Sequence, residues 1–169
     1  MNYTSAEAAK LLRRLKEEYD ALLELESQSF AFVAAVSEDI ESVRPAYDFA
    51  AVQAKLGELE EKIRRVKHAL NVFNSTHEVP GFGMTIDQML VYIPQLNQRR
   101  VKLRDMAGAL PKSRVKGRSA ANSAVIEYNY ANYSVEEAKA AADAASEELA
   151  RAQTALDKVN STETMEIDL

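Results

Sequence analysis

Apolar residues recur at alternating intervals of four and three positions through the middle of the chain. The series reads Val52, Leu56, Leu59, Ile63, Val66, Leu70 and Phe73. Residues with this spacing lie on one face of an α-helix and form a heptad seam, which is typical of helices that pack side by side. The pattern therefore predicts one long helix whose apolar face contacts a neighbouring helix.

The same seam returns 86 positions later. Its members are Ala138, Ala142, Ala145, Leu149, Ala152, Leu156 and Val159. The two helices also match at their ends, because Asp48 and Ser134 are both candidate N-caps, and Glu137 would complete a capping box with Ser134. At the other end, Asn74 and Asn160 are predicted to close the helices in the left-handed conformation.

Two further helices correspond at an offset of 81 positions. Each begins with a candidate capping box, Thr4 with Glu7 and Thr85 with Gln88. Their seams are Ala8, Leu12, Leu15, Tyr19 and Leu22, and then Met89, Ile93, Leu96, Arg100 and Leu103. Matched seams and caps in matched order indicate an internal duplication of a helical hairpin. We therefore expect one domain over residues 1–169, built from pseudo-repeats at about 4–78 and 85–164.

The connections complete the predicted fold. Residues 79–82 place Pro second and Gly third, which is the chemistry of a type II turn, and Pro94 should kink the third helix. Residues 30–36 end the first helix or form a short strand, and residues 123–130 alternate as a strand does. We expect these two segments to pair as a small β-ribbon at the hairpin tips. The fold class is mainly α, with two antiparallel hairpins forming a four-helix bundle or coiled coil.

Composition narrows the function classes. The chain has 169 residues, no Cys, two His and a formal net charge of -5. The chain does not begin with the basic region and apolar run of a signal peptide, and no apolar stretch approaches the length of a membrane span. No phosphate-binding glycine loop, nucleophile elbow or zinc motif is present in the sequence. We therefore predict a cytoplasmic, non-catalytic protein with no cofactor, no metal, no membrane partner and no specific nucleic-acid partner.

The Ala-rich seam of the last helix bears on assembly. Small seam residues let helix axes approach closely but bury little apolar area each. This helix is interpreted as lying between neighbours in a tight bundle, or as contacting another subunit through a second face that includes Leu149. We expect a homo-oligomer.

Basic residues gather in the second half of the chain. Opposed only by Asp105, they are Arg99, Arg100, Lys102, Arg104, Lys112, Arg114, Lys116 and Arg118. Tyr128 and Tyr130 follow, interleaved with Asn residues. Guanidinium and ammonium groups bind phosphates, and aromatic faces stack on bases. The candidate ligand site is Arg100, Lys112, Arg114, Lys116, Arg118, Tyr128 and Tyr130, and the alternative is a solvated basic loop beside tyrosines that cover a core.

Arg100 is the most informative of these residues, because it occupies the seam position at which the first half has Tyr19. A cation that is buried without a partner destabilises the fold by several kcal/mol, on the order of the desolvation penalty. Three outcomes remain open for the Arg100 side chain: it reaches solvent, it pairs with a carboxylate such as Glu26 or Asp20, or it meets an anionic ligand.

The layout resembles a known family. The order of elements is a capped helix, a long tip connection, a second helix ending in Asn, a capped Thr-x-x-Gln helix, an alternating tip and a last helix ending at residues 159–162. This order resembles that of the septicolysin-like family of small bacterial proteins. The resemblance spans about Leu11 to the C-terminus, although Ser161 stands where that family would have an aromatic residue. It implies a helical fold and oligomerisation, and it carries over no functional residue.

Three functional hypotheses follow. The first is an oligomeric helical protein that binds and sequesters an anionic small ligand, most simply a nucleotide or a nucleotide-derived signal. The second is a structural assembly module that pairs with partner helices. The third, implied only by the family name, is a membrane-active protein, which the narrow seams and charged faces disfavour.

Overall fold

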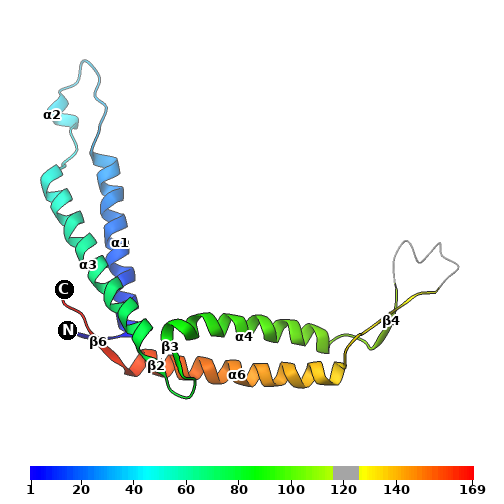
Figure 1. Cartoon of the computed structure of the whole chain (residues 1–169). Helices are drawn as coiled ribbons and strands as arrows, with labels where there is room; N and C mark the ends of the chain where they lie inside the picture. The colour runs from blue at the N-terminus through cyan, green and yellow to red at the C-terminus, as the bar shows by residue number, and fades with distance from the viewer. Residues whose placement is uncertain (116–125) are drawn as a thin grey trace. The chain divides into compact units, whose positions relative to one another are not determined.

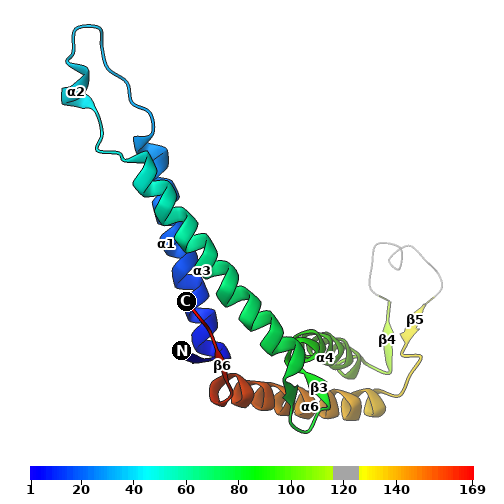
Figure 2. The same ribbon diagram turned by 60° about the vertical axis from the view of Figure 1, so that its left-hand side comes forward.

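The computed structural model describes residues 1–115 and 126–169, and this part of the chain is mainly helical, as the seams predict. Two compact units are present, one made of residues 1–77 with 159–169 and the other of residues 78–158. In the first unit, α1 (Ser5–Ser29) and α3 (Phe49–Thr76) lie side by side, with the short helix α2 (Ile40–Val43) in their connection (Figures 1 and 2).

The second helical hairpin joins α4 (Ile86–Ala107) to α6 (Val135–Thr162), which lie side by side in both views (Figures 1 and 2). The Tyr92 hydroxyl on α4 donates a hydrogen bond to Glu148 Oε1 on α6 over 3.3 Å. Helix α4 continues through Pro94 without interruption. The two helical hairpins are thus confirmed, while their association in one bundle stays a prediction.

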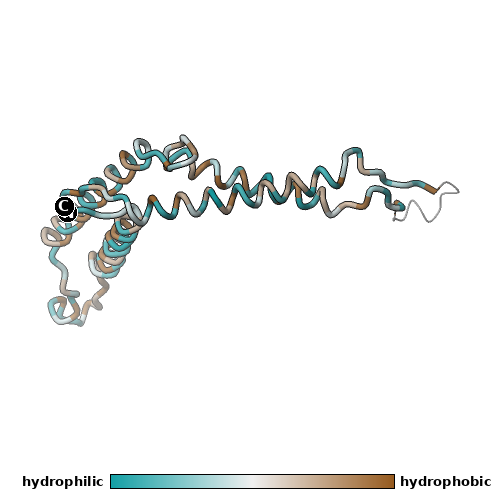
Figure 3. The backbone as a smooth tube through the Cα atoms, turned by 90° about the horizontal axis from the view of Figure 1, so that it is seen from below, coloured by the Kyte–Doolittle hydropathy of each residue, from teal (hydrophilic) through white to brown (hydrophobic). Residues whose placement is uncertain are grey.

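Burial follows the predicted seams in both hairpins. Val66 on α3 and Ala152 on α6, which correspond at the 86-residue offset, are both fully buried. Ala8 and Met89, which correspond at the 81-residue offset, are also fully buried. Apolar positions recur along each helix instead of filling it (Figure 3), and within the described residues no helix is long and apolar enough to cross a membrane.

The predicted N-caps are confirmed. Thr4 and Glu7 form a complete capping box, and Thr85 and Gln88 form its counterpart at the start of α4. Asp48 accepts a hydrogen bond from the Ala51 amide at the start of α3. At the start of α6, the Ser134 hydroxyl accepts one from the Glu137 amide over 3.1 Å. These bonds satisfy amides that the first helical turn would otherwise leave unpaired.

The predicted closure of two helices at Asn residues is wrong. Helix α3 continues past Asn74 to Thr76, helix α6 continues past Asn160 to Thr162, and no non-glycine residue in the described ranges has a positive φ. The cap after α3 is His77, whose backbone is extended. An extended exit leads the chain directly into strand β2, whereas a left-handed residue would have turned it away.

The turn between the halves is confirmed. The Phe82 amide donates to the Val79 carbonyl over 3.2 Å, and Gly81 has φ of +83°, a conformation that favours glycine. The turn joins β2 (Glu78–Val79) to β3 (Met84–Thr85) in an antiparallel pair. Strand β3 then leads into α4 through the capping box at Thr85.

The predicted pairing of the two hairpin tips is wrong. Residues 128–130 do form a strand, β5 (Tyr128–Tyr130), but its partner is β4 (Lys112–Arg114) of the same hairpin. Residues 30–36 form no strand. Pairing within one hairpin closes a shorter loop than pairing between two tips and so costs less chain entropy.

A ribbon that the sequence interpretation missed joins the ends of the chain. Strand β1 (Asn2–Thr4) pairs antiparallel with β6 (Thr164–Glu166), in which Met165 is buried. The two duplication offsets map this ribbon onto β2–β3, because Glu78 opposite Thr85 corresponds to Thr164 opposite Thr4. The conserved register supports the internal duplication.

Candidate functional site

The site residues that the structure brings together lie on the ribbon β4–β5. Lys112 lies opposite Tyr130, and Arg114 lies opposite Tyr128. Backbone hydrogen bonds extend the ladder at both ends, from the Ala131 amide to the Pro111 carbonyl over 3.0 Å, and from the Val115 amide to the Glu127 carbonyl over 3.1 Å. The ribbon therefore fixes the relative positions of two cations and two aromatic rings.

All four of these side chains share one face of the ribbon, since alternate residues of a strand point the same way and opposed residues share a face. We call this surface the ribbon face: Lys112, Arg114, Tyr128 and Tyr130. Lys112 Nζ lies 4.2 Å from the ring centre of Tyr128 and 5.3 Å from that of Tyr130. The two ring centres are 6.4 Å apart, and the rings are 44% and 66% exposed. The ammonium group thus lies beside two accessible aromatic surfaces.

A hydrogen bond anchors the ribbon to its hairpin. The Tyr133 hydroxyl, just after β5, donates to the Met106 carbonyl near the end of α4 over 2.9 Å. This contact satisfies one of the carbonyls that the last turn of a helix leaves unpaired. It also ties the end of the strand that carries Tyr128 and Tyr130 to helix α4.

The opposite face of the ribbon carries Ser113 and Asn129. With Leu110 and Tyr133 these residues line a shallow, open hollow of about 500 Å³. The predicted set of site residues did not contain Ser113 or Tyr133, although Tyr133 follows Tyr128 and Tyr130 in the same segment. Their hydroxyl groups and the Asn129 amide give this side of the ribbon neutral hydrogen-bonding character.

Arg100 lies on α4 and is not part of the ribbon face. Its side chain is half-buried, and one guanidinium nitrogen donates to Asn97 Oδ1 over 2.9 Å. Arg100 Nε is buried and has no hydrogen-bond partner within the described residues. Glu26, one suggested partner, accepts hydrogen bonds from Tyr47 and Gln53 instead. The remaining predicted site residues, Lys116 and Arg118, lie outside the described residues.

The electrostatics of the ribbon face favour an anion. Across residues 1–115 and 126–169, no carboxylate lies within ion-pair distance of Lys112 or Arg114. Lysine and arginine supply hydrogen-bond donors only, and Arg114 can bind two oxygens of one phosphate or carboxylate group. In the same part of the chain, no three His, Asp or Glu side chains gather as metal ligands would.

Comparison with known proteins supports the fold alone. The chain is similar to a functionally unknown conserved protein from Corynebacterium diphtheriae, with a TM-score of 0.59 and 21% sequence identity over 98% of this chain and 100% of that one. No protein-family model and no curated protein sequence matches the chain. Because the similarity extends over nearly the whole chain, the fold as described has a counterpart of known structure.

Proposed function

We propose that the protein is a non-catalytic binding protein that takes an anionic ligand of the nucleotide class on its ribbon face. The observation that carries the proposal is the juxtaposition of Lys112 and Arg114 with the exposed rings of Tyr128 and Tyr130, with no carboxylate of the described residues to neutralise the two cations. Sequestration of such a ligand in a homo-oligomer requires no catalytic group. The septicolysin-like resemblance contributes no residue to the proposal.

The two kinds of side chain suit the two parts of a nucleotide. A base can stack on Tyr130, the more exposed ring, and base–aromatic stacking is worth about 1–3 kcal/mol by alanine substitution. The phosphate can then be held by Arg114 and by Lys112, whose ammonium group lies over the Tyr128 ring. An open face buries less ligand surface than an enclosed pocket does, so we expect modest affinity for a mononucleotide.

The test is a binding titration that uses the protein's own tyrosines. The chain has seven Tyr and no Trp, so tyrosine emission dominates its intrinsic fluorescence. We expect AMP, NAD and cyclic dinucleotides to quench this emission, whereas inorganic phosphate alone should bind weakly because it has no base to stack. Isothermal titration calorimetry at low salt gives an independent affinity.

The variant Lys112→Ala with Arg114→Ala should lose most of the nucleotide affinity without loss of stability, because exposed charges contribute little to folding. The matched control is Lys16→Ala with Lys67→Ala, which removes two exposed cations from the other hairpin. If the control variant loses affinity as much as the ribbon variant, binding is a non-specific charge effect and the proposal fails. It also fails if no member of the nucleotide panel binds the parent protein.

A second candidate function, the assembly module, is favoured by a different surface. The connection between α1 and α3 exposes several large apolar side chains, of which Val33 is 95% exposed and Val36 is fully exposed. Phe30 and Phe49, each 65% exposed, line one hollow at the ends of this connection, and exposed apolar patches mark interaction sites. Binding of partners and binding of a ligand are compatible when they use different parts of one molecule.

A further inference from the structure

The connection between α1 and α3 presents an apolar surface. We call it the tip surface, and its members are Phe30, Val33, Val36, Ile40 and Phe49, all of them exposed. Burying apolar side chains of this size away from water is favourable. None of the five covers the hairpin core, which lies along the seams. The tip surface is therefore suited to contact another molecule.

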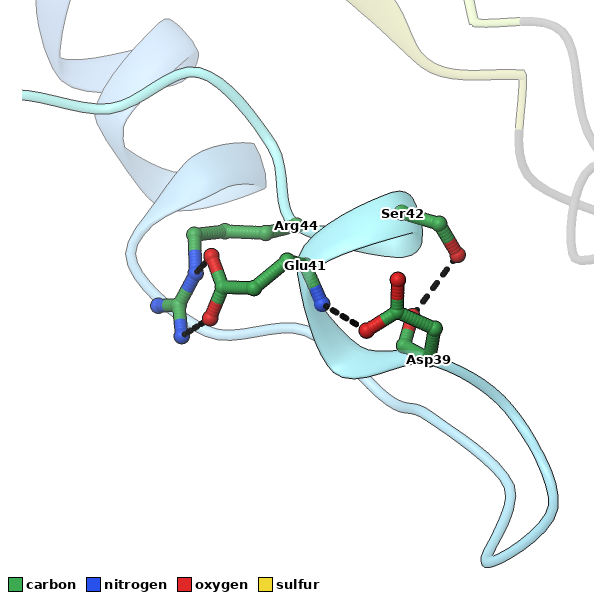
Figure 4. A network of polar contacts seen from close by, with 4 residues as sticks. All are labelled: Asp39, Glu41, Ser42 and Arg44. Atoms are coloured by element: carbon green, nitrogen blue, oxygen red, sulfur yellow. Dashed lines mark hydrogen bonds and ion pairs between the residues drawn. The ribbon is translucent and has the colours of Figure 1, made fainter.

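The tip surface has a defined backbone (Figure 4). Asp39 caps α2 by accepting from the Glu41 amide over 3.2 Å, and the Ser42 hydroxyl donates to the Asp39 carbonyl over 2.7 Å. Arg44 donates two hydrogen bonds to the Glu41 carboxylate, over 2.8 and 2.9 Å. The Arg44 guanidinium also lies 5.2 Å from the ring centre of Phe32. A partner would meet a preformed surface, which lowers the entropic cost of binding.

The charge around the tip surface is negative. Glu38, Asp39 and Glu41 lie in its connection, and Arg44 is the only cation between residues 24 and 49. Arg44 is already paired with Glu41, so it does not neutralise Glu38 or Asp39. A partner that buries the apolar side chains must therefore bring positive charge to their acidic border.

The ribbon face has the complementary composition. It combines Lys112 and Arg114 with the exposed rings of Tyr128 and Tyr130. Tyrosine and arginine are enriched at protein interfaces, where they supply both apolar area and hydrogen bonds. One chain thus carries an acidic apolar surface on one hairpin and a basic aromatic surface on the other.

We propose that the tip surface of one copy of this chain docks on the ribbon face of a second copy. The proposal rests on the ribbon face being a binding surface for anions, as in the proposed function, and it names a second ligand for that face. Because the contact joins two different surfaces, an open assembly has a free tip surface at one end and a free ribbon face at the other until it closes into a ring. Nucleotide and second copy would compete for Lys112 and Arg114, so ligand binding would be coupled to assembly.

The experiment measures self-association of the whole chain by sedimentation velocity from low to high micromolar concentration. We expect the wild-type mass to rise above 18.8 kDa with concentration, and the association to weaken between about 0.05 and 0.5 M salt because charge pairs at the rim of an interface are screened. Two tip variants carry the decisive comparison: Val33→Lys with Val36→Lys, and Val33→Glu with Val36→Glu.

Both variants replace Val33 and Val36, which are almost fully exposed, by charged side chains, and the added charges have opposite signs. The lysine variant should weaken association by at least about tenfold, and the glutamate variant should weaken it much less, because only the former repels the ribbon face. The ribbon variant Lys112→Glu with Arg114→Glu should also be monomeric. Mixed with the lysine variant, it should form a mixed complex, since the two sets of charges are then exchanged.

Each contrary outcome overturns the proposal. A wild-type mass that stays at 18.8 kDa over the whole range excludes the contact. If the lysine and glutamate variants weaken self-association equally, the tip surface contacts something other than the ribbon face. The same conclusion follows if the ribbon variant still self-associates. Tyrosine quenching by nucleotides separates the two proposals: an associating chain that binds no nucleotide refutes only the proposed function, and a monomer that binds nucleotides refutes only the docking.

Discussion

Removal of the Ile167 side chain tests the ribbon that joins the chain ends. Ile167 is 2% exposed, although it lies within three residues of the C-terminus, and its amide donates to the Met1 carbonyl over 2.9 Å. The variant Ile167→Ala deletes three buried carbons. At about 0.8 kcal/mol for each buried carbon, the transfer term alone is about 2.4 kcal/mol.

The free energy of unfolding should fall by an amount within the range of about 2–5 kcal/mol that buried Ile-to-Ala changes show, because the cavity left behind adds to the transfer term. The lower part of this range applies, because a chain end can shift to fill part of the space more easily than a helix can. Urea unfolding followed by circular dichroism measures the free energy of unfolding. The midpoint should fall while the slope with urea stays unchanged.

The matched control is Leu169→Ala, two residues further on, where the side chain is 47% exposed. This variant should stay within about 0.5 kcal/mol of the parent protein. Hydrogen exchange adds a local measurement: the Ile167 amide should be protected in the parent and should exchange faster in Ile167→Ala. If Ile167→Ala and Leu169→Ala have equal unfolding midpoints, the tail contributes nothing to the core and the pairing of β1 with β6 is refuted.

Three further predictions concern a cap, a titration and the seam cation. Thr85→Ala removes the capping box of α4 and should lower the free energy of unfolding by about 1 kcal/mol in a urea titration, whereas Thr85→Ser should not. The hydrogen bond to the Glu26 carboxylate raises the pKa of Tyr47 to about 12, so the stability from this bond is complete below pH 10 and is lost from pH 10 to 12. The pKa values of Tyr19 and Tyr92 are raised as well, so absorbance at 295 nm should show several late-ionising tyrosines, and Tyr47→Phe should remove the last of them. Arg100→Met should keep the parent stability or gain about 1 kcal/mol, because it removes a buried Nε–H that has no partner within the described residues, and a large loss in thermal unfolding would contradict this reading.

The helices could be predicted from the sequence because their determinants are local. A seam such as that from Val52 to Phe73 repeats its spacing over six turns, and a capping box such as Thr4 with Glu7 marks a start within four residues. Such signals do not depend on what the helix packs against. The structure confirmed the helices and their N-caps for this reason, whereas the predicted closures at Asn74 and Asn160 are wrong.

The strands could be predicted only in part because their partners are distant or short. Residues 123–130 alternate and were expected to form a strand, and residues 128–130 do form one. Alternation does not specify the partner strand, however, and the predicted pairing with residues 30–36 is wrong. Strands β1 and β6 are three residues each and lie at opposite ends of the chain. The two duplication offsets could have revealed the pairing of β1 with β6. They make residues 3–4 correspond to β3 and residues 164–165 correspond to β2, and β2 and β3 pair with each other.

The candidate site could be predicted as a set of residue types but not as a geometry. The sequence grouped Arg100 with Lys112 and Arg114 because they are near one another along the chain. In the structure, Arg100 bonds to Asn97 one turn away on α4, while Lys112 and Arg114 face tyrosines across a ribbon. The strand register places Lys112 and Arg114 opposite Tyr130 and Tyr128, and register depends on a pairing that no single segment encodes.

The two offsets locate the change that separates the halves. The first helices of the two hairpins correspond at 81 positions and the second helices at 86, so the stretch between the matched seams is longer in the second hairpin by the difference, five residues (86 − 81). A connection can lengthen at small entropic cost, whereas a seam cannot change length without losing its register with the partner helix. The tips could therefore diverge while the seams stayed matched: one tip holds α2 with an acidic border, and the other holds the basic ribbon β4–β5. Divergence confined to exposed connections is expected where function resides in them and the helices serve as their support.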